Sequence, residues 1–292
     1  VIDFVTRASE DPSVLAIKMT LYRTSGNSPI INSLEKAARN GKQVTVFVEL
    51  KARFDEKQNI SWASQLEQAG AIVVYGIANL KVHAKMLLVV RKEYDGIRRY
   101  VHLSTGNYND KTARLYSDFS LFSSSEELGN DATQFFNMIS GYSSVQTMKV
   151  LSMAPINLKS QLLFMIDREI QNSSKETPGL IMAKMNSLAD KDIIEALYKA
   201  SNAHVHILLN IRGICLIVPG IKGQSENISV VSIVDRYLEH ARVFYFQNNG
   251  EEELYLGSAD WMPRNLEKRV ELMFPIIQED IFKTLKETML VY

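Results

Sequence analysis

The stretch V-H-A-K-M-L-L-V-V, residues 82–90, carries a histidine and a lysine at the head of an uninterrupted apolar run. An apolar run of this length, rich in aliphatic and β-branched side chains, predicts a buried strand. Side chains alternate between the two faces of a strand, so His83 and Lys85 are predicted to share one face. A second strand is predicted at 99–103, and the polar turn at Asp95-Gly96 predicts a hairpin between the two strands.

Upstream of this hairpin, apolar runs alternate with segments of helical spacing. Strands are predicted at 14–21, 44–50 and 71–75, and helices at 1–8, 27–40 and 60–69. Such alternation predicts an α/β unit in which a mixed, mostly parallel β-sheet is flanked by helices. A segment at 133–152 is interpreted as a link that contains a helix.

The same order of chemical groups occurs twice along the chain. H-A-K, S-T-G-N-Y and an aspartate in the first half correspond to H-A-R, G-S-A-D-W and a glutamate in the second half (83–85, 104–108 and 118; 240–242, 257–261 and 271). The acid follows Asn107 by 11 residues in the first half and Asp260 by 11 residues in the second. This repetition predicts two similar domains, which we place at residues 1–145 and 146–292.

The second half is likewise predicted to alternate between helices and strands. Its helices are predicted at 158–171 and 191–202, and its strands at 179–184, 205–209, 228–232, 243–247, 254–257 and 270–275, with a loop before the last strand.

Length and composition limit the class of protein. The chain has 292 residues, enough for two domains at roughly 100–200 residues each. Its formal net charge is zero, which disfavours a protein that coats nucleic acid and requires any anion site to be local. No apolar run reaches the roughly 18 residues of a membrane span, and one cysteine, Cys215, fits a reducing cytoplasm. The absence of an initiator methionine suggests a fragment of a longer protein.

The repeated histidine and basic residue indicate phosphate chemistry. A neutral imidazole nitrogen can attack phosphorus, and the adjacent lysine can receive phosphate oxygens. A nearby acid would fix the tautomer of the ring, and Asp118 and Glu271 are the candidates. A single histidine on an apolar strand is more often a structural core residue, but the repeat and Lys85 favour the functional interpretation of His83.

Several longer strings resemble one family. His-x-Lys followed by a Gly-x-Asn turn, present twice, is loosely similar to the phospholipase D superfamily, although Arg242 and Asp260 replace the lysine and asparagine in the second copy. A closer resemblance is to the bacterial polyphosphate kinase family, which shares that superfamily's fold. The strings that carry it are L-Y-R-T (21–24), V-E-L-K-A-R-F-D-E (48–56), L-K-V-H-A-K (80–85), S-T-G-N-Y-N-D-K-T-A-R-L-Y-S-D (104–118), N-I-R-G-I-C (210–215), I-V-D-R-Y-L-E-H (233–240) and S-A-D-W-M-P-R-N (258–265).

The resemblance implies two phospholipase D-like α/β domains and reversible transfer of the ATP γ-phosphate to inorganic polyphosphate. His83 would be the phosphorylated residue and His240 the second active-site histidine, which also contacts the nucleotide. Tyr116 and Arg212 match ATP-binding positions. We expect Asp118 to orient His83 during the attack.

The resemblance also implies a phosphate and magnesium site. Lys85 and Asn107 are expected to bind phosphate. Arg23 and Arg53 match positions that the family associates with Mg²⁺ and phosphate. An arginine has no lone pair to donate to a metal, so we interpret both as phosphate clamps beside the ion.

Expected partners are ATP, ADP and inorganic polyphosphate, with no nucleic acid and no membrane span. We expect a cytoplasmic location, with peripheral membrane association as a further expectation, and a homo-oligomer for the full-length protein. Full-length members of the family carry additional amino-terminal and helical domains, and the resemblance covers the catalytic portion alone. Two other functions stay open from the sequence, a phospholipase D-type phosphodiesterase acting on lipid or nucleic acid and a non-catalytic binding or assembly fragment.

Overall fold

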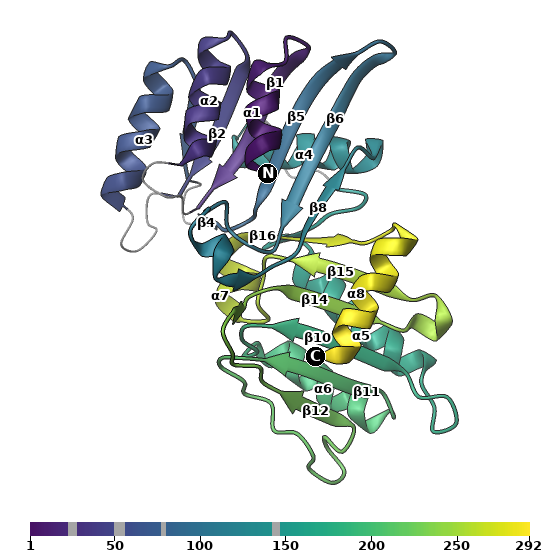
Figure 1. Cartoon of the computed structure of the whole chain (residues 1–292). Coiled ribbons are helices and arrows are strands. Elements are labelled where there is room, and N and C mark those ends of the chain that lie inside the picture. Colours follow the sequence, from purple (N-terminus) through teal and green to yellow (C-terminus); the bar gives the residue numbers. More distant parts are fainter. Residues whose placement is uncertain (23–27, 50–55, 77–79, 142–146) are drawn as a thin grey trace. The chain divides into compact units, whose positions relative to one another are not determined.

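The computed structural model describes residues 1–22, 28–49, 56–76, 80–141 and 147–292. The chain divides into two compact units (Figure 1), and each is treated separately here. The first unit comprises Val1–Arg114 and Ser120–Leu151, and the second comprises Leu115–Phe119 and Ser152–Tyr292. One short segment of the first half of the sequence therefore belongs to the second unit.

The first unit is a mixed sheet covered by helices. Its strands lie in the order β3-β2-β1-β5-β6-β8. The elements are α1 (Ile2–Glu10), β1 (Val14–Leu21), α2 (Pro29–Arg39), β2 (Gln43–Val48), α3 (Glu56–Gln68), β3 (Ile72–Tyr75), β4 (Lys81–Val82), β5 (Met86–Glu93), β6 (Gly96–Ser104), η1 (Thr112–Arg114), β8 (Ser120–Ser123) and α4 (Glu126–Ile139).

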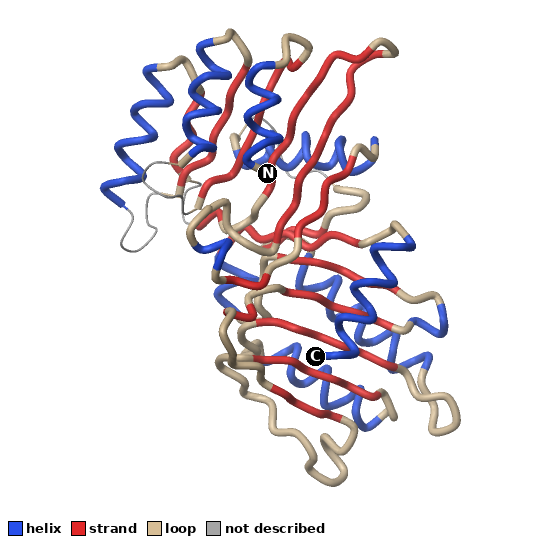
Figure 2. The backbone as a smooth tube through the Cα atoms, viewed as in Figure 1, coloured by secondary structure: helices blue, strands red, loops and turns tan. Residues whose placement is uncertain are grey.

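Alternation along β2 shows why helices cover both faces of this sheet. Val46 and Val48 join the apolar cluster that contains Leu34 of α2 and Leu66 of α3. Phe47 points the other way and contacts Phe136 of α4, with ring centroids 5.6 Å apart. The tube in Figure 2 shows α1, α2 and α3 on one face of the sheet and α4 on the other.

The second unit repeats this arrangement. Its strands lie in the order β12-β11-β10-β14-β15-β16, β9 pairs with β16, and β13 pairs with β7. The elements are β7 (Tyr116–Ser117), β9 (Ser152–Ala154), α5 (Leu158–Asn172), β10 (Leu180–Met185), α6 (Lys191–Asn202), β11 (His206–Ile211), β12 (Ile228–Val231), β13 (Leu238–Glu239), β14 (Arg242–Phe246), η2 (Asn248–Gly250), β15 (Glu253–Gly257), α7 (Pro263–Lys268), β16 (Arg269–Pro275) and α8 (Glu279–Val291).

The two sheets have matching topology. The first three strands in the order given for each sheet, β3-β2-β1 and β12-β11-β10, run parallel. The other strands of each order join them through antiparallel pairings. The expected α/β class with mixed sheets flanked by helices is confirmed. The expectation of mostly parallel sheets was wrong, because β5, β6 and β8 in the first sheet and β14, β15 and β16 in the second join through antiparallel pairings.

The strand predicted over residues 82–90 is interrupted at its histidine. β4 ends at Val82 and β5 begins at Met86, so His83 and Lys85 lie in a break. The hydroxyl of Thr20 donates to the carbonyl of Ala84 at 2.7 Å and accepts from the amide of Met86 at 3.0 Å. The Thr20 side chain therefore replaces the backbone hydrogen bonds of a regular strand pairing there. The second unit has the same break, with His240 between β13 and β14.

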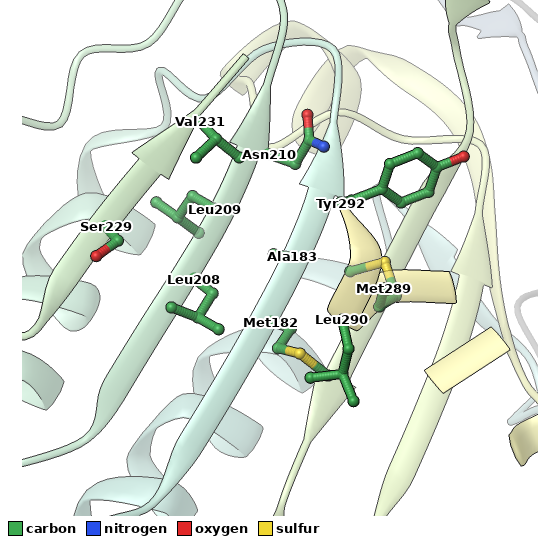
Figure 3. Close-up of a pocket in the computed structure, with 10 residues that line it drawn as sticks. All are labelled: Met182, Ala183, Leu208, Leu209, Asn210, Ser229, Val231, Met289, Leu290 and Tyr292. Atoms are coloured by element: carbon green, nitrogen blue, oxygen red, sulfur yellow. The ribbon is translucent and has the colours of Figure 1, made fainter. Parts of the chain in front are cut away.

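The sheet of the second unit also has apolar cover on both faces. Ile181 and Ile207 pack with Leu162 of α5 and Leu197 of α6. The opposite face meets α8, and Figure 3 shows the side chains that surround a pocket of about 140 Å³ there. They are Met182, Ala183, Leu208, Leu209, Asn210, Ser229, Val231, Met289, Leu290 and Tyr292. None of the helices in the described ranges is long and apolar enough to cross a membrane.

Candidate active site

His83 and Lys85 are buried together in the first unit. Their residues are 8% and 2% exposed. The Lys85 ammonium donates to the backbone carbonyl of His83 at 2.5 Å and lies 5.8 Å from the centre of the Tyr22 ring. The Tyr22 ring meets the imidazole edge-on, with centroids 5.0 Å apart. The arrangement places a cation immediately beside a candidate nucleophile, where it can stabilise phosphate oxygens.

The small-residue turn after β6 lies beside this pair. The amide of Ser104 donates to the carbonyl of Lys85 at 3.1 Å, and the Ser104 hydroxyl accepts from the amide of Gly106 at 3.0 Å. The side-chain oxygen of Asn107 is buried and has no hydrogen-bond partner within the described ranges. An amide oxygen can only accept, so this atom does not itself support phosphate binding. A phosphate contact of Asn107 would be made by its side-chain NH₂ group and stays a prediction.

Two uncharged side chains, His102 and Tyr108, contact each other at this turn. His102 Nδ1 and the Tyr108 hydroxyl lie 2.9 Å apart, and both residues are buried. Burial, with a smaller effect from the amino terminus, lowers the pKa of His102 to about 3. Burial also raises the pKa of Tyr108. Both groups are therefore uncharged near neutral pH, which fits a structural role for His102.

His240 in the second unit lies between a carboxylate and a guanidinium group. Its Nδ1 is 2.9 and 3.0 Å from the two carboxylate oxygens of Asp118. Its Nε2 is 3.1 Å from Nη1 of Arg242. A guanidinium can only donate, so Nε2 accepts, and the ring proton lies on Nδ1 and is donated to Asp118. This geometry selects one neutral tautomer of His240.

The contact between Asp118 and His240 follows from strand pairing. β7 and β13 run parallel, and Ser117 lies opposite Glu239. The carbonyl of Ser117 accepts from the amides of His240 and Ala241 at 3.1 and 2.9 Å. The next residue, Asp118, is therefore brought to the His240 ring. From the sequence, Asp118 is expected to orient His83, and that role stays a prediction beside the contact with His240.

The other candidate acid, Glu271, stabilises the second turn. It is fully buried. Its carboxylate accepts from the Ser258 hydroxyl at 2.5 Å and from the side-chain amide of Asn265 at 2.7 Å. Asn265 belongs to α7, a helix that replaces the predicted loop. These contacts fix the backbone on both sides of Asp260.

A polar network extends from His240 to Arg212. Arg242 Nε donates to Asp260 Oδ1 at 3.1 Å, and the backbone amide of Asn186 donates to the same oxygen at 2.9 Å. Arg212 Nε donates to Asn186 Oδ1 at 2.5 Å. Burial alone would raise the pKa of Asp260, but Arg242 and the hydrogen bonds from Asn186 outweigh it and lower that pKa.

Two cationic groups and an aromatic ring surround this network. Burial, and then the charge of Arg242, lower the pKa of Arg212. An anion bound beside Arg212 would stabilise its charged form. Tyr116, the other expected ATP contact in this unit, lies with its ring centroid 5.1 Å from that of His240. The second unit thus brings together His240, Tyr116 and Arg212, all expected from the sequence.

Two of the expected positions cannot be placed. Arg23 and Arg53, expected at the phosphate and magnesium site, lie outside the described residues. Over the described ranges, no group of three or more His, Cys, Asp or Glu side chains could hold a metal ion.

Two residues that contact the site, Tyr22 and Asn186, were not predicted from the sequence. Tyr22 directly follows β1, and Asn186 directly follows β10, the matching strand of the second unit. Both lie at the carboxyl end of a central strand, where α/β sheets usually carry their sites. That placement was available from the predicted strands and could have identified both residues.

The chain is similar to known polyphosphate kinases along its whole length. The family model for polyphosphate kinase C-terminal domain 1 matches residues 1–145, and that for C-terminal domain 2 matches residues 151–292. The polyphosphate kinase of Halalkalibacterium halodurans is 56% identical over 291 residues, which are 100% of this chain and 41% of that protein. The polyphosphate kinase of Synechocystis sp. is 56% identical over 283 residues, 97% of this chain and 39% of that protein. The chain therefore spans about two fifths of these relatives.

Solved structures give the same grouping. The crystal structure of polyphosphate kinase from Porphyromonas gingivalis has a TM-score of 0.90 and 38% identity, covering 99% of this chain and 47% of that one. Phosphatidylserine synthase from Haemophilus influenzae Rd KW20 has a TM-score of 0.63 at 11% identity, covering 98% of this chain and 83% of that one. The second likeness is one of fold alone.

Proposed function

Because the chain belongs to the polyphosphate kinase family, we propose that it takes part in reversible transfer of the ATP γ-phosphate to inorganic polyphosphate through a phosphohistidine at His83. The observation that carries this proposal is the burial of Lys85 against the carbonyl of His83 at 2.5 Å. A fixed cation beside the imidazole suits attack on a phosphate group, whose equatorial oxygens stay negative throughout.

The first step forms the covalent intermediate. A neutral imidazole nitrogen of His83 attacks the γ-phosphorus in line, and the bond to the bridging oxygen breaks to release ADP. Lys85 stabilises charge on the γ-oxygens, and Asn107 offers its side-chain amide to them. Asp118 is proposed to help orient His83, in addition to its hydrogen bond with His240.

The second step regenerates the histidine. A terminal oxygen of polyphosphate attacks the phosphorus, the bond between nitrogen and phosphorus breaks, and the polymer grows by one phosphate. His240, with its proton on Nδ1, supports this chemistry by contacting the nucleotide or by transferring a proton at Nε2. Arg212 and Tyr116 are proposed to bind the nucleotide, Arg212 through its guanidinium and Tyr116 through its ring.

Magnesium is proposed to accompany the nucleotide. When bound, Mg²⁺ neutralises phosphate oxygens, and in such sites it is commonly held by the phosphates and water. Arg23 and Arg53 are proposed as phosphate clamps beside it, since neither can ligate a metal.

Phosphorylation of the 292-residue chain by γ-³²P-ATP tests the proposal. We expect acid-labile, base-stable label on the wild type and none on His83→Ala. His206→Ala, at an exposed position on β11, serves as the control and should keep the label. Label that survives His83→Ala would exclude His83 as the phosphorylated residue.

The same protein separates the alternative functions. A phospholipase D-type phosphodiesterase should act on a diester substrate in the presence of EDTA, whereas phosphoryl transfer from ATP should stop. A non-catalytic fragment should show neither label nor ATP binding by calorimetry.

A further inference from the structure

Asn186 is the central residue of the network in the second unit. It lies immediately after β10 and is 7% exposed. Its Oδ1 accepts from Arg212 Nε at 2.5 Å, and its Nδ2 donates to Asp260 Oδ1 at 3.0 Å and to the carbonyl of His240 at 3.4 Å. One side-chain amide therefore contacts three residues that lie in three different connecting segments, after β11, after β13 and after β15.

The hydrogen bond at Nε determines how Arg212 can be used. A guanidinium is planar, so a bond at Nε fixes the plane in which its two terminal nitrogens lie. Arg212 is half-buried, and over the described ranges its hydrogen bond is the one to Asn186. The fork formed by Nη1 and Nη2 is thereby oriented while remaining available for a bidentate contact with an anion.

Gly213 holds the same residues together through the backbone. Its amide donates to the carbonyl of Asn186 at 2.8 Å. A Cβ at position 213 would lie 2.8 Å from that carbonyl oxygen, closer than real contacts allow. The absence of a side chain at Gly213 lets the backbone next to Arg212 approach Asn186.

We propose that Asn186 is the positioning residue of Arg212: it orients the guanidinium fork toward a nucleoside triphosphate and links it to the Asp260–Arg242 pair beside His240. The identity of the anion rests on the proposed function, whereas the orientation of Arg212 does not. A purely structural Asn186 would support Asp260 without influencing ligand binding, and the two roles predict different results.

ATP affinity in single and double variants distinguishes these roles. We expect Asn186→Ala to weaken ATP binding about tenfold, the loss typical of a hydrogen bond to a charged group. Arg212→Ala should weaken it further, and adding Asn186→Ala to that variant should change the affinity by less than about twofold, because the two residues act as one unit. Multiplicative losses, or unchanged affinity in a folded Asn186→Ala protein, would overturn the proposal.

Asn210 provides a matched control. It is 5% exposed on the neighbouring strand β11, and its side-chain nitrogen has no hydrogen-bond partner within the described ranges. Asn210→Ala removes an equally buried amide and should leave ATP affinity unchanged. An Asn210→Ala protein that binds ATP as weakly as Asn186→Ala would attribute the loss to general destabilisation and count against the proposal.

An NMR measurement tests the orientation of Arg212 independently of catalysis. The Nε–H proton of Arg212 should exchange slowly with water in the wild type and in Asn210→Ala, and rapidly in Asn186→Ala. Equal exchange rates in wild type and Asn186→Ala would refute the proposed orientation. If ATP fails to bind the wild type while the exchange difference is present, the proposed function fails and the positioning of Arg212 stands.

Discussion

Individual side chains of the second unit define the state of one imidazole ring. Asp118 accepts the Nδ1 proton of His240, and Arg242 donates to Nε2. We therefore expect Asp118→Asn to lower kcat by about 10²-fold or more, because the amide can stabilise the other tautomer. Steady-state kinetics measure the effect. Asp167→Asn, at an exposed position on α5, is the control, and equal kcat values for wild type and Asp118→Asn would contradict the assigned role.

A second prediction at this scale concerns pH and His102. Its pKa is about 3 when folded, below the ordinary value of 6.5, so the unfolded chain binds the proton more readily. The stability that neutral His102 contributes is thus fully present above pH 6.5 and is lost as the pH falls toward 3. The loss in unfolding free energy is on the order of a few kcal/mol. Denaturant unfolding at several pH values should show this slope. His102→Gln should flatten it and His206→Gln should not; an unchanged slope in His102→Gln would disprove the assignment.

Which single residues could be predicted depended on the kind of signal. His83, Lys85 and His240 were accessible because a motif and its repeat mark them. The contact of Asp118 with His240 was not accessible, since it depends on a two-residue strand pairing that leaves no periodic pattern. Tyr22 lies in the L-Y-R-T string and Asn186 in no quoted motif, and the position of each after a predicted strand was the signal that could have identified its contacts.

Among the elements, the break before β5 depends on one hydroxyl. Thr20 contacts both Ala84 and Met86 and is 2% exposed. Thr20→Val keeps the shape and leaves two buried backbone groups unpaired, so we expect a loss of about 1–3 kcal/mol in unfolding free energy. We also expect weaker phosphorylation of His83. Denaturant titration and γ-³²P labelling measure the two effects.

Thr45 on β2 is the control for this element. It is also buried, at 7% exposure, and no hydrogen bond of its hydroxyl is found within the described ranges. Thr45→Val should therefore cost little. If Thr20→Val and Thr45→Val proved equally stable, the hydroxyl of Thr20 would not be what maintains the break.

Most elements were predictable, and the exceptions have physical causes. The strand at Val14–Leu21 and the helix at Lys191–Asn202 were predicted with their bounds, because long apolar runs and clear helical spacing mark them. α7 was interpreted as a loop because its six residues, Pro263–Lys268, are too few to show helical spacing. The break at His83 was missed because the apolar run continues through it, and a side-chain contact interrupts the ladder.

At the scale of the whole molecule, the repeat predicted a shared topology, and the two sheets have the same strand order and pairing directions. The second unit, however, includes Leu115–Phe119. A chain limited to residues 146–292 should therefore lack the pairing partner of β13 and the acid of His240. We expect the amides of Leu238 and His240 in a folded fragment to exchange far faster than in the intact chain, as measured by hydrogen exchange. Equal protection would contradict this dependence.

The membership of Leu115–Phe119 in the second unit also limits how such chains can recombine. A crossover anywhere between residues 120 and 151 combines residues 152–292 from one parent with Asp118 and Tyr116 from the other. The imidazole and its carboxylate would then come from different lineages, although they function as a pair. Chimaeras should work best when this short segment is inherited with residues 152–292, so the smallest exchangeable module is discontinuous in the gene.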